Sequence, residues 1–136
     1  MCLTICDVRT NEFRRQNKDK QEVTVYKVLK VIRFEDGPIY ITPYIGNRVS
    51  PNMVLRATFP DKPPFRAASA SYYYIDIQGV HAFTSKYLAL AFSKMFPDSI
   101  IVECTGKMSD FIAVGYDGDI AFKALTFGEL TPVQNP

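Results

Sequence analysis

The chain has 136 residues, of which 47% are hydrophobic and 22% charged, enough to build the core of one folded domain and to exclude wholesale disorder. A net charge of only +2 makes nucleic acid a less favoured partner than protein. No apolar run reaches the roughly 18 residues that span a membrane, and the N-terminus lacks a secretory signal pattern, so we expect a soluble cytoplasmic protein without membrane contact.

The chain divides into three consecutive segments of a single domain. We expect a polar basic N-terminal segment, a core and a tail at residues 1–22, 23–127 and 128–136. Residues 1–8 alternate weakly, which favours a short strand. Residues 9–22 contain one large apolar residue, Phe13, and therefore predict either a loop or a helix with almost nothing to bury.

The core begins with two expected strands. Residues 23–34, VTVYKVLKVIRF, are largely apolar on both alternating faces, which is typical of a central strand covered on both sides. The following EDG, at 35–37, predicts a turn whose glycine takes a positive φ. Residues 38–46 predict a second strand at an edge or with a bulge, because Pro38 and Pro43 have no N–H to donate.

A proline-rich excursion separates these strands from the next ones. Residues 47–71 contain four prolines and are expected to be irregular, with a short strand at 53–59. Long ordered loops of this kind often carry function. Residues 70–79 then predict a strand that ends at a glycine, and VHAF at 80–83 predicts a short strand or an extended lead-in.

The clearest helix is predicted over residues 84–96. Thr84 or Ser85 can cap it, because a hydroxyl at that position accepts a hydrogen bond from an otherwise unpaired backbone N–H. An apolar stripe at helical spacing is expected to face the core, and it consists of Leu88, Ala91, Phe92, Met95 and Phe96. Pro97 should stop the helix.

Two final segments complete the expected sheet. Residues 99–104 predict a half-buried strand with its apolar face formed by Ile100, Val102 and Cys104. Residues 111–127 predict two strands around a tight turn at Asp117 and Gly118. The fold class is therefore α+β, a small single domain with an antiparallel or mixed sheet of about six strands and one main helix packed on it.

Positive charge is concentrated near the N-terminus. Residues 1–30 contain seven Lys and Arg residues against four acids. Arg14, Arg15 and Lys18 are therefore candidate binding residues for an acidic protein or for nucleic acid. A solvated polar arm is the structural alternative for the same residues.

Cysteine usage argues against a disulfide or metal framework. The three cysteines, Cys2, Cys6 and Cys104, are an odd number, and no pair has C-x-x-C spacing. The sequence also holds a single histidine, so we expect no metal site and no cofactor. Cys104 lies in an apolar run and is interpreted as a small buried hydrophobe.

His81 and the tyrosines are the remaining candidates for a binding site. His81 is flanked by apolar residues, so we expect a structural role with its ring hydrogen-bonded near the helix start, and ligand binding or proton transfer as the alternative. Tyr72 and Tyr74 would share one side of a strand and offer a stacking surface to bases or to a partner protein. Ordinary strand packing is the alternative explanation for both tyrosines.

The order of several short motifs is similar to that in a known group of proteins. A Tyr-Lys-Val strand, a Gly-x-His-Ala-Phe segment before a helix and a Val-x-Cys strand occur here as Tyr26, Lys27, Val28, Gly79, His81, Ala82, Phe83, Val102 and Cys104. Over residues 23–127 the chain resembles a loose group of small uncharacterised proteins of bacteriophages and phage-rich bacterial genomes. It departs from them after Cys104, where the proline of a proline-glycine step is absent. The group has no settled activity, so the resemblance implies an origin and no mechanism.

The expected function is that of a small non-enzymatic binding protein of phage or mobile-element origin. It would act in the host cytoplasm on a host protein, for instance a defence nuclease, and nucleic acid is the less favoured partner. An alternative comes from a resemblance to ADP-ribosyltransferase-type folds, in which Lys27, Thr84–Ser85 and Glu103 or Glu129 would stand for the basic residue, the hydroxyl segment and the late glutamate. The usual arginine or histidine and a Glu-x-Glu pair are absent.

Overall fold

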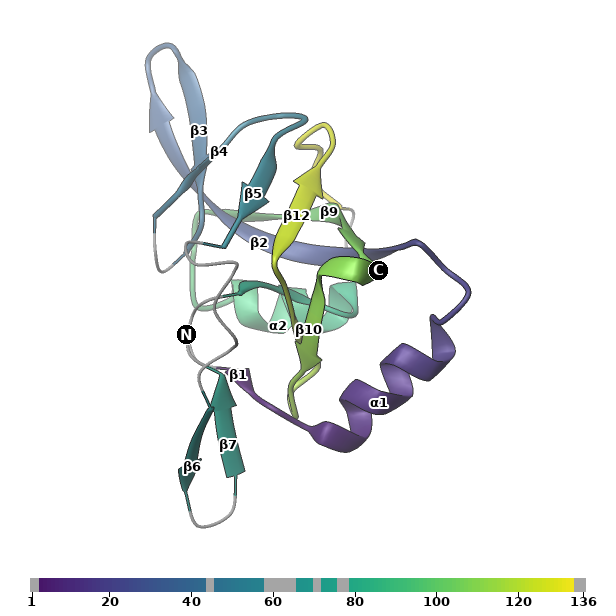
Figure 1. Ribbon diagram of the computed structural model, residues 1–136. Helices are drawn as coiled ribbons and strands as arrows, with labels where there is room; N and C mark the ends of the chain where they lie inside the picture. Colours follow the sequence, from purple (N-terminus) through teal and green to yellow (C-terminus); the bar gives the residue numbers. More distant parts are fainter. Residues whose placement is uncertain (1–2, 44–45, 58–65, 70–71, 76–78, 134–136) are drawn as a thin grey trace.

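The computed structural model describes residues 3–43, 46–57, 66–69, 72–75 and 79–133 (Figure 1). The helices are α1 (Asp7–Gln16), α2 (Lys86–Ser93) and a short 3-10 helix (Met108–Asp110). The strands are β1 (Leu3–Thr4), β2 (Glu22–Phe34), β3 (Gly37–Ile41), β4 (Arg48–Val49), β5 (Val54–Arg56), β6 (Arg66–Ser69), β7 (Tyr72–Ile75), β8 (Val80–Phe83), β9 (Ser99–Lys107), β10 (Phe111–Val114), β11 (Asp119–Phe122) and β12 (Ala124–Phe127). Every pairing between these strands is antiparallel.

The α+β class is confirmed, whereas the prediction of about six strands and one main helix is wrong. The described strands form a nine-stranded sheet and a separate three-stranded sheet, β1-β7-β6. The excursion predicted to be irregular contributes β4, β5 and β6, and the expected short strand is found as β5. Strands of two to four residues leave little periodic signal, so the sequence undercounts them. The proline-rich residues 58–65 lie outside the described part of the chain.

The predicted central strand is confirmed. β2 pairs with β9 along nine positions, with β3 at its far end and with β8 at a single position. The turn after it places Gly37 at φ 119°, as its sequence predicted. β3 ends before Pro43, and Pro38 lies on the part of β3 that β4 does not reach, which fits the expected edge position.

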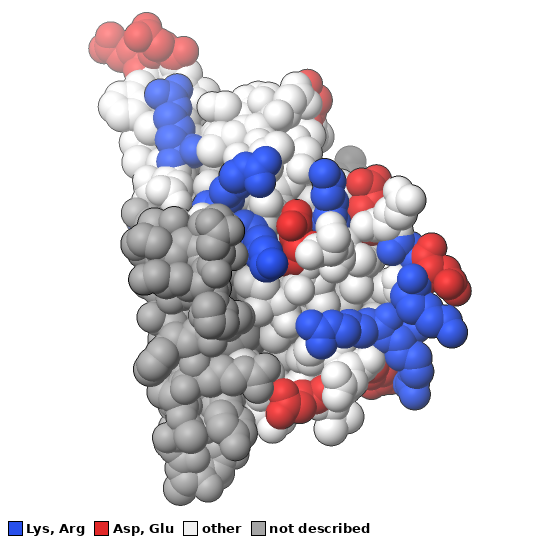
Figure 2. Space-filling view, viewed as in Figure 1, with Lys and Arg blue, Asp and Glu red and all other residues white. Residues whose placement is uncertain are grey.

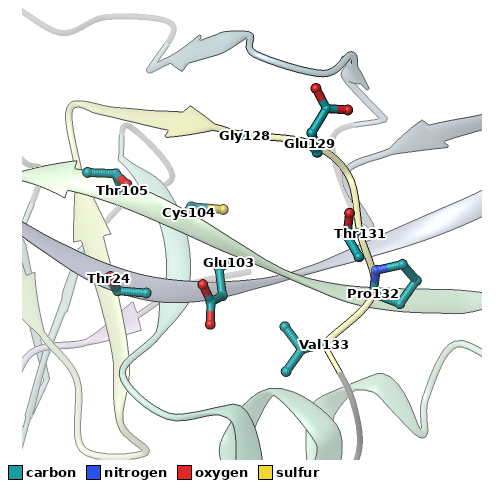
Figure 3. Close-up of a pocket in the computed structure, with 9 residues that line it drawn as sticks. All are labelled: Thr24, Glu103, Cys104, Thr105, Gly128, Glu129, Thr131, Pro132 and Val133. Carbon is teal, nitrogen blue, oxygen red and sulfur yellow. The ribbon is translucent and has the colours of Figure 1, made fainter.

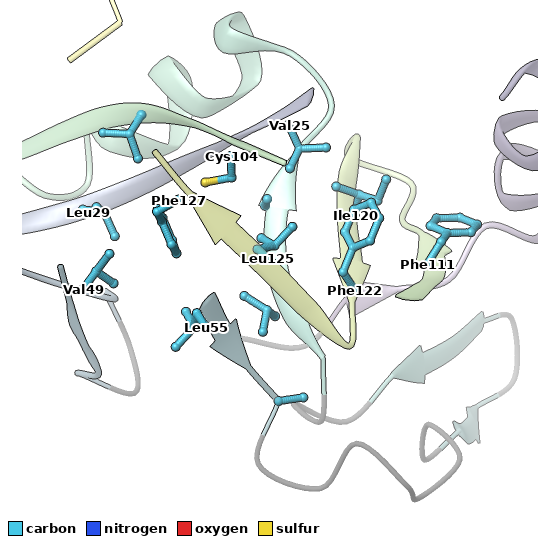
Figure 4. Packing of buried hydrophobic residues seen from close by; sticks show 14 of the residues in the cluster. Val25, Leu29, Val49, Leu55, Cys104, Phe111, Ile120, Phe122, Leu125 and Phe127 are labelled. Atoms are coloured by element: carbon cyan, nitrogen blue, oxygen red, sulfur yellow. The ribbon is translucent and has the colours of Figure 1, made fainter. Parts of the chain in front are cut away.

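One bent strand joins the two sides of the nine-stranded sheet. β11 and β12 are separated only by Lys123, yet β11 pairs with β8 while β12 pairs with β9. Because β2 pairs with both β8 and β9, the hydrogen-bonded order runs β11-β8-β2-β9-β12, and the chain itself closes this order into a ring by joining β11 to β12 through Lys123. The main apolar cluster lies on the inner side of this ring (Figure 4), and its most deeply buried large side chains include Phe122, Phe127, Leu29 and Leu125.

Helix α2 confirms its predicted cap but not its predicted stripe. The Ser85 hydroxyl accepts a hydrogen bond from the Leu88 N–H at 3.3 Å. Ala89 is the fully buried residue, however, whereas Leu88 and Met95 are 37% and 62% exposed. Nearly every residue from 87 to 92 is apolar, so periodicity could not select the packed face. The helix also ends at Ser93, before the last two members of the stripe.

The two ends of the chain are more ordered than the sequence suggested. A strand was predicted over residues 1–8. In the described part of this segment only the two-residue β1 is a strand, because α1 begins at Asp7. The tail was expected to fray, but the Val133 N–H donates to the Ile101 carbonyl at 2.7 Å and Val133 packs beside α2. This part of the tail therefore covers the outer face of β9.

Candidate functional site

His81 lies in the middle of β8 and is 8% exposed. Its neighbours Val80 and Ala82 belong to the main inner cluster, so the His81 side chain faces the other side of the strand, where Ala121 is its cross-strand partner. Burial, and after it the nearby Lys27 charge, lowers the His81 pKa to about 4. The ring is therefore neutral at physiological pH and does not serve as a proton carrier there.

A hydrogen bond from the His81 ring to the start of the helix was predicted, and the ring nitrogen Nε2 does not make it. Nε2 is buried and has no hydrogen-bond partner among the described residues. The His81 carbonyl accepts a hydrogen bond from the Lys27 Nζ at 2.6 Å, which joins β8 to β2 and not to the helix start. The structural role predicted for the His81 ring stays a prediction.

Lys27 was named from the sequence as part of the Tyr-Lys-Val motif and as the basic residue of the ADP-ribosyltransferase likeness. Lys27 lies on the same face of β2 as Val25 and Leu29, which is the inner face. Its cross-strand partner Val102 is fully buried. Burial lowers the Lys27 pKa to about 8. The ammonium stabilises the seam where β2 and β8 share a single residue pair, because it binds the His81 carbonyl there. The signal available in the sequence was a lysine on the alternating face that otherwise holds Val25, Leu29 and Val31.

Cys104 is buried at 2% exposure, which confirms its interpretation as a core residue. Burial raises its pKa to about 12, against the opposing influence of the nearby Lys27 charge. Because the thiolate is the reactive form, this protonated thiol is a poor nucleophile. Lys27 and Cys104 therefore lie on the inner side of the sheet, and His81 meets Lys27 there only through its carbonyl.

Tyr72 and Tyr74 lie in β7, the central strand of the small sheet. β7 pairs with β6 through Tyr72–Ser69 and Tyr74–Ala67, and with β1 through Tyr74–Thr4. The resulting hairpin projects away from the main sheet (Figure 1). The predicted stacking surface depends on tyrosine side chains that lie outside what the structure describes, so it stays a prediction.

Arg14, Arg15 and Lys18 come together at the C-terminal end of α1. Arg15 and Lys18 are exposed, and Arg15 makes only a long, exposed ion pair with Glu12 at 3.9 Å. The Arg14 guanidinium lies 5.1 Å from the centre of the Phe111 ring and donates to the Ile112 carbonyl at 3.4 Å. Figure 2 shows Lys and Arg side chains gathered over this helix.

Helix α1 is attached to β10 through polar contacts. Its one buried residue, Thr10, both donates to the Val114 carbonyl and accepts from the Val114 N–H, at 3.2 and 3.0 Å. Phe13 adds a ring contact with Phe111 at 4.9 Å. The helix predicted to have almost nothing to bury is therefore present, and it holds its basic end in a defined place.

A shallow groove of about 490 Å³ lies between β2, β9 and the folded-back tail (Figure 3). Its polar lining consists of Thr24, Glu103, Thr105, Glu129 and Thr131. Glu103 lies on β9 and Glu129 at the start of the tail, where its carboxylate points away from the other lining residues (Figure 3). No pattern in the sequence indicates this groove, because the groove exists only where the tail packs against β9.

The positions required by the ADP-ribosyltransferase likeness do not converge. Lys27 and its partner Val102 face the inner cluster, whereas Glu103 is exposed on the opposite face of β9. The Thr84 hydroxyl donates to the β10–β11 turn, and Ser85 caps α2. These two hydroxyls serve local structure, so the geometry gives this likeness no support.

The described ranges contain neither a metal-binding cluster nor a membrane-spanning helix. No group of three or more His, Cys, Asp or Glu side chains there is placed to hold a metal ion. None of the helices in these ranges is long and apolar enough to cross a membrane. In comparisons with known proteins, no family model matches the chain, and no significant match to a curated protein or a solved structure was found.

Proposed function

We propose that this chain is a small non-enzymatic binding protein of phage or mobile-element origin. Its partner is an acidic surface of a host protein, for instance a nuclease of a defence system. The contact surface is the basic end of α1, defined here as Arg14, Arg15, Lys18 and Lys20. Asp19 is the single acid within this stretch, so the surface is positive on balance.

The observation that carries the proposal is the way α1 is held. Its attachment uses the Thr10 hydroxyl, the Phe13 ring and the Arg14 guanidinium, all directed at β10. Arg15 and Lys18 take no part in that attachment and remain exposed. A rigidly held helix that presents exposed cations loses little backbone freedom on binding, which favours recognition of a complementary charged surface.

The interior chemistry also favours binding over covalent catalysis. His81 has a pKa of about 4 and an unpaired buried nitrogen, so it neither carries a proton at neutral pH nor reaches solvent freely. Cys104 has a pKa of about 12 and is protonated. The phage or mobile-element origin rests on the motif resemblance around Tyr26, His81 and Cys104 alone.

Charge reversal on α1 tests the contact surface. The tagged protein is used to capture proteins from a bacterial lysate, beside the Arg15→Glu/Lys18→Glu variant. A control, Lys107→Glu/Lys123→Glu, makes the same change of charge at exposed residues of the sheet. We expect the first variant to lose at least about tenfold of the captured protein, because like charges now face each other, and the control to retain it.

Two outcomes would contradict the proposal. Capture that is equally strong for both variants removes α1 as the contact surface. Binding of a DNA or RNA probe that weakens steeply with salt, together with no protein captured above background, assigns the basic end of α1 to nucleic acid instead.

A further inference from the structure

The β2–β3 hairpin extends beyond the body of the sheet (Figure 1) and carries an exposed apolar face. Ile32 and Phe34 are 37% and 59% exposed, large values for side chains of this kind. Ile39 is the cross-strand partner of Ile32 and therefore lies on the same face. We call Ile32, Phe34 and Ile39 the hairpin face.

The other side of the same hairpin is covered at its base, whereas Arg33 and its partner Pro38 farther along that side are exposed. Val31 is 7% exposed, and its cross-strand partner Tyr40 packs against the main cluster and pairs with Val49 of β4. Alternation along β2 therefore gives this hairpin one face that belongs to the core and one that has no partner in the described chain. An apolar side that is left uncovered on a projecting ribbon marks an interaction surface.

The hairpin face continues toward the end of α2. Lys30, on the same face of β2, places its Nζ 6.0 Å from the centre of the Phe96 ring. Met95, beside Phe96 in the chain, is 62% exposed and enlarges the apolar surface at the base of the hairpin. Lys94 comes just before it and is exposed.

Positive and negative charges lie at opposite ends of this surface. The base of the hairpin has the cations Lys30 and Lys94, and the exposed turn at its tip has the anions Glu35 and Asp36, with apolar side chains between them. The acidic tip is visible at the top of Figure 2. Arg33 is already paired with Asp98 at 3.2 Å and lies outside this arrangement.

We propose that the hairpin face is the contact of a homodimer, in which a second copy of this chain lies antiparallel against it. In that orientation a two-fold axis places the acidic tip of each copy over the basic base of the other. Ile32 and Phe34 of one copy then meet the same residues of its partner. An isologous contact needs a self-complementary surface, and the order cation, apolar, anion satisfies that requirement.

The charge order also selects this occupant over others. An unrelated acidic partner would be repelled by Glu35 and Asp36, and an unrelated basic one by Lys30 and Lys94. The surface is small compared with the roughly 1,200–2,000 Å² of a stable complex, so we expect a reversible dimer with a micromolar dissociation constant. This contact is separate from α1, so it neither requires nor excludes the function proposed above.

Sedimentation equilibrium from about 5 to about 500 µM measures the dimer directly. The wild-type chain should shift from monomer to dimer over this range, and Phe34→Asp should weaken association at least tenfold. Val54→Asp is the matched control, because Val54 is also an exposed strand residue, at 41%, on a different part of the sheet. Thermal unfolding of both variants checks that the fold is retained.

Charge exchange tests the antiparallel orientation. Glu35→Lys/Asp36→Lys makes both ends of the surface basic, and Lys30→Glu/Lys94→Glu makes both ends acidic. Each variant alone should be at least tenfold weaker as a dimer, whereas an equimolar mixture should form the mixed dimer. A single chain with all four substitutions should regain association, because each reversed tip again meets an oppositely charged base.

Three results would overturn the dimer. The wild-type chain stays monomeric up to about 500 µM. Phe34→Asp associates as strongly as the Val54→Asp control. The two charge variants fail to associate when mixed although both are folded, which would show that tip and base do not meet.

Discussion

The two helices are attached to the sheet by different kinds of contact. Helix α2 places the fully buried Ala89 over β2 and β9, and its Phe92 ring lies 5.1 Å from that of Phe83. Helix α1 fully buries only Thr10, and it depends on hydrogen bonds to β10 together with one ring contact, between Phe13 and Phe111. Hydrophobic patterning therefore detects α2 readily, whereas α1 is held by groups that carry no periodic signal.

Both helices nevertheless contact the same turn between β10 and β11. From α1, the Arg9 guanidinium donates to the Tyr116 carbonyl at 2.6 Å. From the start of α2, the Thr84 hydroxyl donates to the Gly118 carbonyl at 3.1 Å, and Leu88 packs against the same glycine. This turn links a helix held by polar contacts to one held by apolar contacts, so changes here should affect both.

The largest effect is expected from Gly118→Ala. Gly118 has φ 80°, which L side chains rarely adopt, and an added Cβ would collide with Leu88 Cδ1. We expect the free energy of unfolding to fall by about 2–3 kcal/mol in urea denaturation. Gly128→Ala is the control, because nothing lies within 4 Å of its added Cβ, and it should change stability by less than about 0.5 kcal/mol. Equal losses in both variants would contradict this explanation.

The attachment of α1 is tested by Thr10→Val, which keeps the shape of the side chain. The Val114 N–H then loses its buried acceptor, which should lower the free energy of unfolding by about 2 kcal/mol. Hydrogen exchange at the Val114 amide should accelerate at the same time. Asn11→Ala, at an exposed site on the same helix, serves as the control. An unchanged amide exchange rate would show that the Thr10 hydroxyl does not hold the helix.

The pH dependence of the shared turn is tested by Asp119→Asn. Burial, and to a lesser degree Asp117, raises the pKa of Asp119 from 3.8 to about 6. The native state therefore holds this proton more tightly than the unfolded chain, and the resulting stability is complete below pH 4 and lost as the pH rises through 6.

Asp119→Asn removes that titration, so it should be more stable than the wild type by about 1–2 kcal/mol at pH 8 and equal to it near pH 4. The difference between the two denaturation series isolates this group, because other titrating residues are common to both. A difference that is the same at both pH values would show that the Asp119 carboxyl does not titrate differently on folding.

The smallest effect is expected at the start of α2. Ser85→Ala removes the acceptor for the Leu88 N–H and should cost about 1 kcal/mol in the free energy of unfolding. Ser85→Asp retains an acceptor and should stay within about 0.5 kcal/mol of the wild type. If both substitutions cost the same, the serine contributes through packing and not as a cap.

The sequence predicted those parts of the fold that depend on neighbouring residues. The Ser85 cap, the positive φ of Gly37 and the hairpin at Asp117–Gly118 all follow from local backbone chemistry. It also placed Arg14, Arg15 and Lys18 correctly on a helix or loop that buries little. The packed face of α2 was predicted wrongly, because the helix carries apolar residues on all of its sides.

The candidate surfaces were harder to predict than the elements. The basic end of α1 was named from charge alone, and the groove beside Glu103 was missed because residues 128–133 must fold back to form it. The hairpin face was missed for another reason. Ile32 and Phe34 continue the apolar pattern of a covered strand, and only the tertiary arrangement shows that nothing described covers them.

By itself, the sequence determined the central strand β2, the capped helix α2 and the tight turns, because each leaves a recognisable pattern in residues that are neighbours in the chain. Only the tertiary structure decided that β11 and β12 close the sheet through Lys123, that the carbonyl of His81 receives the Lys27 ammonium, and that one face of the β2–β3 hairpin stays open. These features join residues distant in the chain, and their geometry is set by strand register and burial, which local patterns do not encode.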